Sequence, residues 1–235
     1  MDLVGGTNDL KNGIIRTVGN PVDRFNEDRL RIMRAIRFAA RFGSNLDSTT
    51  DQALETDSSL KGISSERIRD EFIKSIKFAK SVVYLLNLYK KYNLFKWIFG
   101  ALEVDFSIFI EEYDPIVLIA CLLRKNNVDL VKKELNHLSY STEEVSKIAF
   151  LLKMLSFKPE MILKYKKAEI NSKITSSELI EFSRLNNLDM NLIKKFIGFK
   201  LTVTGDDMLK QGIKPGPEMG KTIEQAEFDN FIEFI

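Results

Sequence analysis

The segment RFNEDRLRIMRAIRFAARFG, residues 24–43, places a Glu-Asp pair and regularly spaced arginines in what otherwise has the pattern of one buried helix. An aspartate presents hydrogen-bond acceptors, and an arginine presents a planar fork of donors. On a continuous helix, Asp28 and Arg31 are three residues apart and stand side by side. Together, these two side chains could hydrogen-bond the Watson-Crick edge of one nucleobase.

Such a pair would discriminate between bases. Cytosine and adenine each present an exocyclic amine beside a ring nitrogen, so Asp28 would accept from the amine and Arg31 would donate to the nitrogen. Uracil and guanine reverse this pattern and would be rejected. The plainer alternative is that Glu27 and Arg31 form an ordinary i,i+4 ion pair on a solvated face, worth about a few tenths of a kcal/mol. The helix pattern alone favours this alternative.

The helix that would position these side chains is predicted over residues 27–42. At 100° per residue its sequence separates into two faces. The apolar face, which would hold the helix to a core, contains Ile32, Met33, Ile36, Ala39 and Ala40. The polar face contains Glu27, Arg31, Arg34, Arg37 and Arg41.

The overall composition is that of a globular protein without a global electrostatic field. The chain has 235 residues, 44% hydrophobic content and a formal net charge of +2, so any nucleic-acid contact must come from a local concentration of charge. Seven of the eleven arginines lie within the first 41 residues. The single cysteine, Cys121, excludes an internal disulfide, and the single histidine, His137, leaves no cluster with metal-ligand spacing. We expect both to be structural.

The pattern of apolar residues predicts an all-α fold. Prolines are few and alternating, strand-like runs are scarce. Beyond residues 27–42, helices are predicted over residues 48–57, 65–92, 115–124, 128–137, 142–155, 159–168, 176–186, 189–199, 206–211 and 218–227. Their expected caps are Ser65, Ser141 or Thr142, and Ser176.

Two segments rich in turn formers are predicted to be loops. They are DLVGGTNDLKNG, residues 2–13, and GIKPGPEMGK, residues 212–221, which would start a helix at Pro217 or Glu218. The N-terminus lacks the cationic and apolar regions of a signal peptide, and no apolar run approaches the roughly 20 residues that cross a bilayer. We therefore expect a reducing, cytoplasmic setting.

The run GGTNDLKNGIIRTVGNPVDRFNEDRLRIMRAIRFAARFG, residues 5–43, resembles the class II tRNA nucleotidyltransferases, which are the CCA-adding enzymes, and their relatives the bacterial poly(A) polymerases. The resemblance includes the EDxxR motif, which spans residues 27–31 here. ISSERIRDEFIK, residues 63–74, and GDDMLKQGIKPGPEMGKTI, residues 205–223, also look like family segments. Residues 95–200 match only as helices of similar pattern.

The resemblance implies an elongated multi-helix neck, body and tail. Residues 1–20 would connect to a catalytic head, residues 21–92 would form the neck with the nucleotide-selecting helix, residues 93–200 the helical body, and residues 201–235 a tRNA-binding tail. Protein side chains would then replace a nucleic-acid template in base selection. The nucleotide-binding residues would be Asp28, Arg31, Glu27, Arg34 and Arg37. For the arginines from residue 34 onward, contact with a triphosphate, lining of the neck and pairing with acids of the body all stay open.

The head motifs of the family do not occur in this sequence: the glycine-rich loop, the pair of metal-binding aspartates and the Arg-Arg-Asp motif. We therefore expect no catalytic residue and no metal ligand in this chain, and no activity from it alone. The implied partners are tRNA and a catalytic head, in cis or as a separate chain. The implied cofactor is Mg²⁺, held by the head, and the substrates are ATP and CTP.

The tail loop would contact the phosphates of tRNA. Lys210, Lys214, Gly216 and Lys221 are the expected RNA-binding residues, because glycines allow close backbone approach and lysines attract phosphate. A packing corner between two helices explains the same residues equally well. Three functions compete: the base-selecting and tRNA-holding part of a CCA-adding enzyme, a poly(A) polymerase fragment, and a headless α-helical RNA-binding protein without catalysis. The sequence does not distinguish addition of CCA from addition of CC or A.

Overall fold

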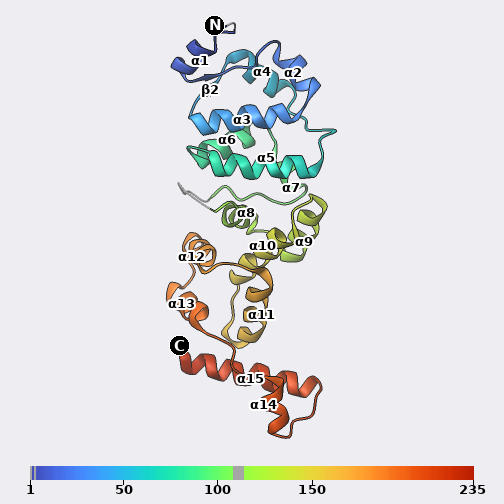
Figure 1. Ribbon diagram of the computed structural model, residues 1–235, viewed down its shortest axis with the longest axis vertical. Coiled ribbons are helices and arrows are strands. Elements are labelled where there is room, and N and C mark those ends of the chain that lie inside the picture. The colour runs from blue at the N-terminus through green and yellow to red at the C-terminus, as the bar shows by residue number, and fades with distance from the viewer. Residues whose placement is uncertain (1, 3, 108–113) are drawn as a thin grey trace. The chain divides into compact units, whose positions relative to one another are not determined.

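The computed structural model describes residues 2, 4–107 and 114–235. Helices dominate these residues (Figure 1). The strands found in the described part are β1 (Ile14–Ile15) and β2 (Asn45–Leu46), which pair in parallel with Ile14 opposite Asn45. The prediction of an all-α fold is confirmed. Among the described residues, no helix combines the length and apolar character needed to span a bilayer.

The chain forms two compact units. The first comprises residues 1–115 and 125–141, and the second comprises residues 116–124 and 142–235. The functional boundaries predicted at residues 20, 92 and 200 stay predictions.

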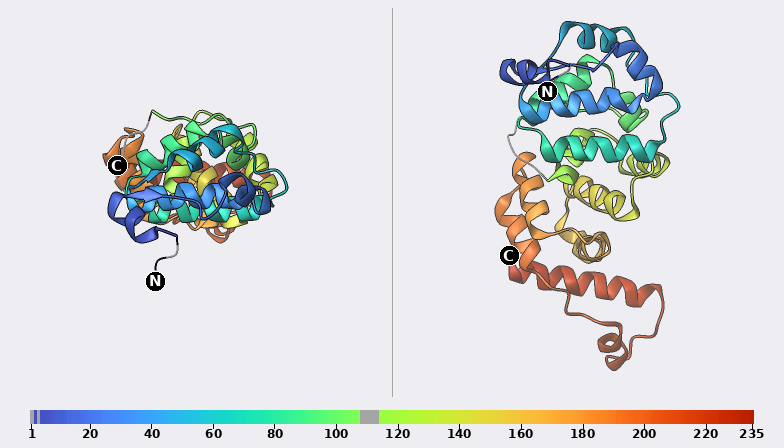
Figure 2. Two further views of the ribbon diagram at one scale, coloured as in Figure 1. Left: turned by 90° about the horizontal axis from the view of Figure 1, so that it is seen from above. Right: turned by 45° about the horizontal axis from the view of Figure 1, so that its top comes forward.

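The first unit is built around α3, which packs against α5 and α6. In both views α3 and α5 lie side by side (Figure 1 and Figure 2). Ile32, Met33 and Ile36 of α3 are fully buried, as expected for the apolar stripe of an amphipathic helix. The helices of this unit are α1 (Gly6–Asn12), α2 (Pro21–Glu27), α3 (Leu30–Phe42), α4 (Ser48–Thr56), α5 (Ser65–Phe78), α6 (Val82–Lys91), α7 (Phe95–Phe99) and α9 (Val128–His137).

The second unit has an aromatic core of its own. Phe157 makes edge contacts with Phe196 and Phe231, and Phe231 makes another with Phe199. Its elements are α8 (Pro115–Leu123), α10 (Thr142–Met154), the 3-10 turn η1 (Pro159–Met161), α11 (Ile162–Ser172), α12 (Ser176–Leu185), α13 (Met190–Gly198), α14 (Gly205–Lys210) and α15 (Pro217–Phe234).

The linker before α14 is held to α15 by a buried carboxylate. Glu227 Oε1 accepts hydrogen bonds from the backbone amides of Thr202 and Val203, at 2.7 and 2.6 Å. Glu227 is fully buried. Because a buried carboxylate is costly unless hydrogen-bonded, these two bonds tie the tail helices to the linker that leads into them.

Several helix boundaries differ from the prediction. The loop predicted over residues 2–13 contains α1, whose first turn is capped by Asp2: its carboxylate accepts from the amides of Gly6 and Thr7 at 3.1 and 2.7 Å. The helix predicted over residues 65–92 is two helices, because Ser81 caps a new one at α6.

Other predictions missed by smaller margins. Ser64 and Thr175 cap α5 and α12, in place of Ser65 and Ser176. Helix α15 continues to Phe234, and α7 was not predicted. The prediction over residues 128–137 is confirmed at both ends.

Candidate nucleotide and RNA-binding site

The polar segment around Asp28 is a junction between two helices. Asp28 is extended, with φ −151° and ψ 104°, and it ends α2. Its Oδ1 accepts a hydrogen bond from the Leu30 amide at 3.1 Å, and α3 begins there. Short acidic side chains compete for backbone amides in this way and interrupt helices. The prediction of one continuous helix over residues 27–42, with Asp28 and Arg31 three residues apart on it, is therefore wrong.

The junction nevertheless keeps Asp28 and Arg31 close along the backbone. The Arg31 amide donates to the Asp28 carbonyl oxygen at 3.0 Å. In the described part of the chain, the two side chains form no ion pair with each other. The aspartate therefore leaves the helix while the arginine stays in the first turn of the next one.

The Glu27–Arg31 ion pair expected from the alternative interpretation is present. Arg31 Nη1 donates to Glu27 Oε2 at 2.5 Å and to the Arg24 carbonyl oxygen at 3.0 Å. Arg24 Nη1 donates to the same Glu27 oxygen at 2.6 Å. Mainly because of the bond from Arg31, the pKa of Glu27 is lowered. These bonds hold one edge of the Arg31 guanidinium.

The other edge of Arg31 is available to a ligand. Its Nε and Nη2 groups make no hydrogen bond to any residue that the structure describes, although an arginine carries donors on all three nitrogens. The ion pair therefore does not exclude base recognition. It anchors the guanidinium and leaves donors in a fixed orientation.

The partner of Asp28 is Arg67, which lies on α5 and outside the arginine-rich segment. Arg67 Nη2, on α5, lies 3.2 Å from Asp28 Oδ2 and 3.4 Å from Oδ1. The side chains are 51% and 29% exposed, so the pair is accessible to solvent and weak. Sequence reasoning did not select Arg67. Its only signal was its place in ISSERIRDEFIK, residues 63–74.

The remaining predicted arginines have different surroundings. Arg37 Nε donates to Glu71 Oε1 at 2.5 Å between α3 and α5, with side chains only 12% and 8% exposed. Arg34 is exposed and makes no ion pair with any described residue. Arg41 lies over the rings of Phe42 and Phe78. Of these three, Arg34 has the guanidinium best placed for an incoming phosphate.

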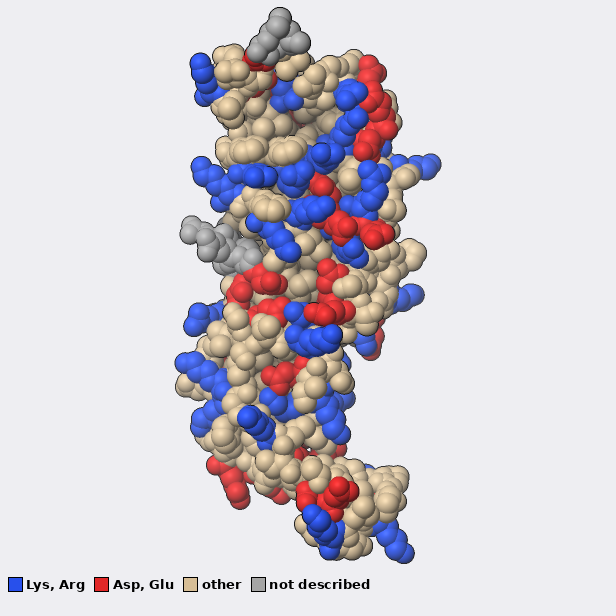
Figure 3. Space-filling view, viewed as in Figure 1, with Lys and Arg blue, Asp and Glu red and all other residues tan. Residues whose placement is uncertain are grey.

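Basic side chains gather on the face of the first unit that carries α3 and α5 (Figure 3). The exposed basic residues of α3 and α5 include Arg34, Arg41, Lys74 and Lys77. A local concentration of this kind attracts polyanions even though the net charge of the chain is small.

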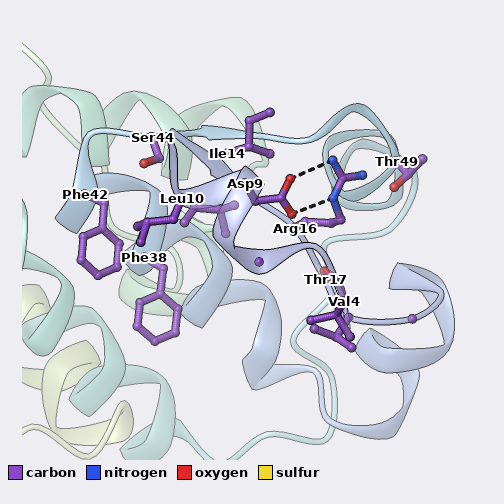
Figure 4. Close-up of a pocket in the computed structure, with 14 residues that line it drawn as sticks. Val4, Asp9, Leu10, Ile14, Arg16, Thr17, Phe38, Phe42, Ser44 and Thr49 are labelled. Atoms are coloured by element: carbon purple, nitrogen blue, oxygen red, sulfur yellow. Dashed lines mark hydrogen bonds and ion pairs between the residues drawn. The ribbon is translucent and has the colours of Figure 1, made fainter. Parts of the chain in front are cut away.

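A groove of about 620 Å³ lies near the N-terminal residues of the same unit. Figure 4 shows Phe38 and Phe42 projecting from α3 beside Leu10, with the Asp9–Arg16 ion pair at the other end of the groove. Arg16 Nε lies 2.9 Å from Asp9 Oδ2. The lining is largely apolar, and the residues of the α2–α3 junction do not contribute to it.

The tail residues lie in the second unit, on α14, α15 and the loop between them. Lys210, Lys214, Gly216 and Lys221 are all exposed, and Lys210 Nζ is 3.7 Å from an Asp207 oxygen. Gly216 has φ 154°, a conformation that favours glycine, and it directly precedes α15. The loop can therefore present lysines and backbone to a ligand, and its contact with RNA stays a prediction.

The described residues contain no group of three or more His, Cys, Asp or Glu side chains that could hold a metal ion. They therefore do not fit the Mg²⁺ site that the resemblance implies for the full enzyme.

Known proteins match both the sequence and the fold. Residues 45–106 match the family model described as the probable RNA and SrmB-binding site of polymerase A. The CCA-adding enzyme of Lactobacillus helveticus is 28% identical over 243 residues, which covers 96% of this chain and 61% of that enzyme. Over nearly its whole length the chain is similar to CCA-adding enzymes. It spans about 61% of the length of that relative.

Solved structures of CCA-adding enzymes share the fold. The Bacillus stearothermophilus CCA-adding enzyme in complex with CTP matches with a TM-score of 0.72 and 21% identity, covering 97% of this chain and 63% of that one. The Thermotoga maritima CCA-adding enzyme complexed with tRNA matches with a TM-score of 0.63 and 21% identity, covering 98% and 63%. At this identity, the likeness establishes the fold.

Proposed function

We propose that this chain is the base-selecting and tRNA-holding part of a CCA-adding tRNA nucleotidyltransferase, which extends the 3′ end of tRNA with CTP and ATP. One observation carries the proposal. Glu27 holds one edge of the Arg31 guanidinium, the donors on its other edge bond to no described residue, and the partly exposed carboxylate of Asp28 belongs to the same α2–α3 junction. Donors and acceptors are thus available together on a part of the chain that is otherwise well packed.

Base selection at this junction uses the chemistry of the two side chains. The Asp28 carboxylate accepts from the exocyclic amine of cytosine or adenine, and Arg31 donates to the adjacent ring nitrogen. The amine approaches Asp28 Oδ2, which has a second lone pair beside the one that accepts from Arg67, so Arg67 stays in place and orients the carboxylate. Uracil and guanine place an oxygen where Asp28 needs a donor, and they are rejected by unpaired polar groups.

The nucleotidyl transfer itself belongs to a catalytic head. Attack by a 3′ hydroxyl needs divalent metals that stabilise the attacking and leaving oxygens. Since the described residues offer no metal site, Mg²⁺ and its ligands would come from that head, in cis or as a separate chain. The contribution of this chain is to bind and orient the nucleotide and the tRNA.

The part of the groove lined by Val4, Leu10 and Val18 is suited to contact with the head. Its apolar side chains are unusually exposed, with Leu10 76% exposed. It lies next to the residues that the resemblance assigns to the connection with the head. Covering it would remove apolar surface from water, which is favourable.

A tRNA-binding experiment tests the proposal. The chain is titrated into labelled tRNA that lacks its 3′ CCA, at two salt concentrations, with oligo(A) as a competitor. We expect the affinity for tRNA to fall steeply with salt concentration, because binding rests on phosphate contacts. We expect oligo(A) to compete poorly with tRNA. A Lys214→Ala, Lys221→Ala variant should reduce the salt slope by about two. The exposed Lys61, in the first unit, provides a matched Lys61→Ala control.

A second candidate is the corresponding part of a poly(A) polymerase, because the matching family model is described by its binding site in polymerase A. The same titration separates the two. Preference for oligo(A) over tRNA favours the polymerase, and an absence of binding to either RNA at low salt refutes an RNA-holding role.

A further inference from the structure

Two phenylalanine rings are exposed where α3 and α5 end. Phe42, the last residue of α3, is 50% exposed, and Phe78, the last residue of α5, is 52% exposed. The two helices pack side by side, so these rings belong to one surface of the first unit.

The guanidinium of Arg41 lies close to both rings. The Arg41 Cζ atom is 5.5 Å from the centre of the Phe42 ring and 5.4 Å from the centre of the Phe78 ring. The two rings are therefore held close together without covering each other. Behind Phe42, the Phe38 ring is stacked at 6.2 Å with an interplanar angle of 7°. One cation thus lies near two exposed rings, an arrangement that cation–π attraction stabilises.

The surrounding charge is positive and is not neutralised locally. Lys74 and Lys77 are exposed on α5, and Lys80 follows it. Lys80 is positioned by its amide, which donates to the Ala40 carbonyl oxygen at 2.9 Å. Within the described residues, neither these lysines nor Arg41 form an ion pair. Of the neighbouring acids on α5, Glu71 is buried against Arg37 and Asp70 pairs with Arg69.

We infer that this aromatic-cationic surface, formed by Phe42, Phe78, Arg41, Lys74, Lys77 and Lys80, binds unpaired nucleotides of RNA. The exposed ring faces stack on bases, and the ammonium groups contact the phosphates between them. Paired bases are already stacked inside a duplex, so only a single-stranded segment can use the rings. An apolar protein segment is disfavoured by the uncompensated cations around each ring.

The inference deepens the proposed function and rests on RNA binding by this chain. Phe78 and the three lysines lie within residues 45–106, the region that matches the probable RNA-binding family model. The surface also continues toward the base-selecting junction. Arg31, Phe38 and Phe42 are spaced by seven and four residues, so they lie along one stripe of α3, about 16 Å long. Unpaired nucleotides on Phe42 would therefore lie within a few nucleotides of Arg31.

The test compares two RNAs that differ only in a single-stranded extension. One labelled hairpin carries four unpaired 3′ nucleotides, and the other is blunt. Affinities are measured by fluorescence anisotropy with the wild-type chain and with Phe42→Ala and Phe78→Ala. Each alanine variant should bind the extended hairpin about five- to a hundredfold more weakly and leave the blunt hairpin nearly unchanged. Phe78→Tyr keeps the ring and should keep the affinity.

Controls separate stacking from other effects. Leu130→Ala removes an apolar side chain of the same unit that is 43% exposed, and it should leave both affinities unchanged. The Lys74→Ala, Lys77→Ala double variant should bind both hairpins more weakly, by a similar factor, and its affinity should depend less steeply on salt concentration. Thermal melts of each variant confirm that the first unit stays folded.

Three outcomes overturn the inference. The first is that the Phe42→Ala, Phe78→Ala double variant binds the extended hairpin as tightly as wild type does. The second is that it loses the same factor in affinity for both hairpins. The third is that it associates more weakly with a catalytic head while its RNA affinity is unchanged. The last result would show that the rings dock protein. The proposed function fails separately, through loss of tRNA binding or through unchanged base selectivity in Asp28 variants.

Discussion

Asp28 and Arg67 form an ion pair although 39 residues separate them in the sequence, with Arg67 Nη2 3.2 Å from Asp28 Oδ2. The pair joins the α2–α3 junction to α5. Together with the hydrogen bond that Asp28 Oδ1 accepts from the Leu30 amide, it fixes the carboxylate that would select the base. The candidate selectivity of the site therefore depends on a residue outside the arginine-rich segment.

The first prediction concerns Arg67 as a positioning residue. In an enzyme in which this chain is joined to a catalytic head, Arg67→Ala should leave the Asp28 carboxylate held by the Leu30 amide alone and therefore less firmly oriented. Discrimination against UTP and GTP should fall several-fold, and the melting temperature should change little because the pair is exposed. Arg67→Lys should partly restore discrimination. Single-nucleotide incorporation with all four triphosphates measures this, with Lys61→Ala as a control. If the Arg67→Ala variant selects nucleotides as wild type does, Arg67 does not position the carboxylate of Asp28.

The second prediction concerns Asp28 itself. Asp28→Ala should lower incorporation of both CTP and ATP, and discrimination against UTP and GTP should fall about ten- to a hundredfold, because a hydrogen bond to a charged group is lost. The junction adds a cost in stability that the sequence did not predict. Loss of the bond to the Leu30 amide should lower the free energy of unfolding by about 1 kcal/mol.

Asp28→Asn separates these two effects. The amide keeps an acceptor for Leu30 and should melt like wild type, but it loses the charge that holds Arg67 and receives the base amine. Altered nucleotide choice in a fully stable Asp28→Asn variant supports the pocket. Normal choice in that variant, with only the alanine variant destabilised, would reduce Asp28 to a capping residue.

The two faces of α3 could be predicted from sequence because burial there follows the helical period. Ile32, Met33 and Ile36 are all buried, as predicted for the apolar face of an amphipathic helix. The break at Asp28 could not be predicted in the same way. Glu27 and Asp28 continue the period, and the interruption depends on one carboxylate capturing one amide and on Arg67 from α5.

The role of Arg37 shows the same limit of sequence pattern. It follows Arg34 by three residues, and the two share a polar face in the helical plot. Their surroundings differ because α5 covers one edge of that face and brings Glu71 to Arg37. Sequence periodicity gives the direction of a side chain, whereas the neighbouring helix decides whether it meets solvent or a counter-ion.

The third prediction concerns the pH dependence of the Glu27–Arg31 pair. The pKa of Glu27 is lowered in the folded chain, chiefly by the hydrogen bond from Arg31. A lowered pKa means that the ionised carboxylate stabilises the fold above its unfolded pKa, about 4.3, and that this contribution is lost as the pH falls through the lower folded value. Glu27→Gln should therefore melt below wild type at neutral pH, and the two melting temperatures should converge as the pH falls through the lowered pKa of Glu27.

The same variant tests whether the ion pair serves the site. Without its anchor, Arg31 should sample more orientations, so KM for CTP and ATP should rise while the choice of base is kept in part. Glu66→Gln, an exposed acid in the first turn of α5, gives the control for a general change in charge. A pH-independent melting difference for Glu27→Gln would contradict the electrostatic explanation.

The fourth prediction separates two arginines that the sequence treats alike. Arg37 and Glu71 form a largely buried pair, so Glu71→Ala should leave an uncompensated guanidinium between α3 and α5 and reduce the free energy of unfolding by about 3 kcal/mol. Arg34 is exposed without an ion pair to a described residue, so Arg34→Ala should change stability by less than about 0.5 kcal/mol.

The effects on nucleotide binding should be reversed: Arg34→Ala should affect KM more than substitution of the Arg37–Glu71 pair does. If Arg34 contacts the triphosphate, Arg34→Ala raises KM for CTP and ATP together and does not change selectivity, because phosphate contacts do not identify the base. Replacing both Arg37 and Glu71 by methionine and leucine should restore much of the stability lost in Glu71→Ala, since an apolar pair can replace a buried ion pair. Denaturant unfolding and nucleotide kinetics on the same preparations measure both properties. A stable Arg37→Met, Glu71→Leu enzyme with normal KM would assign Arg37 to the helix interface and leave phosphate contact to Arg34.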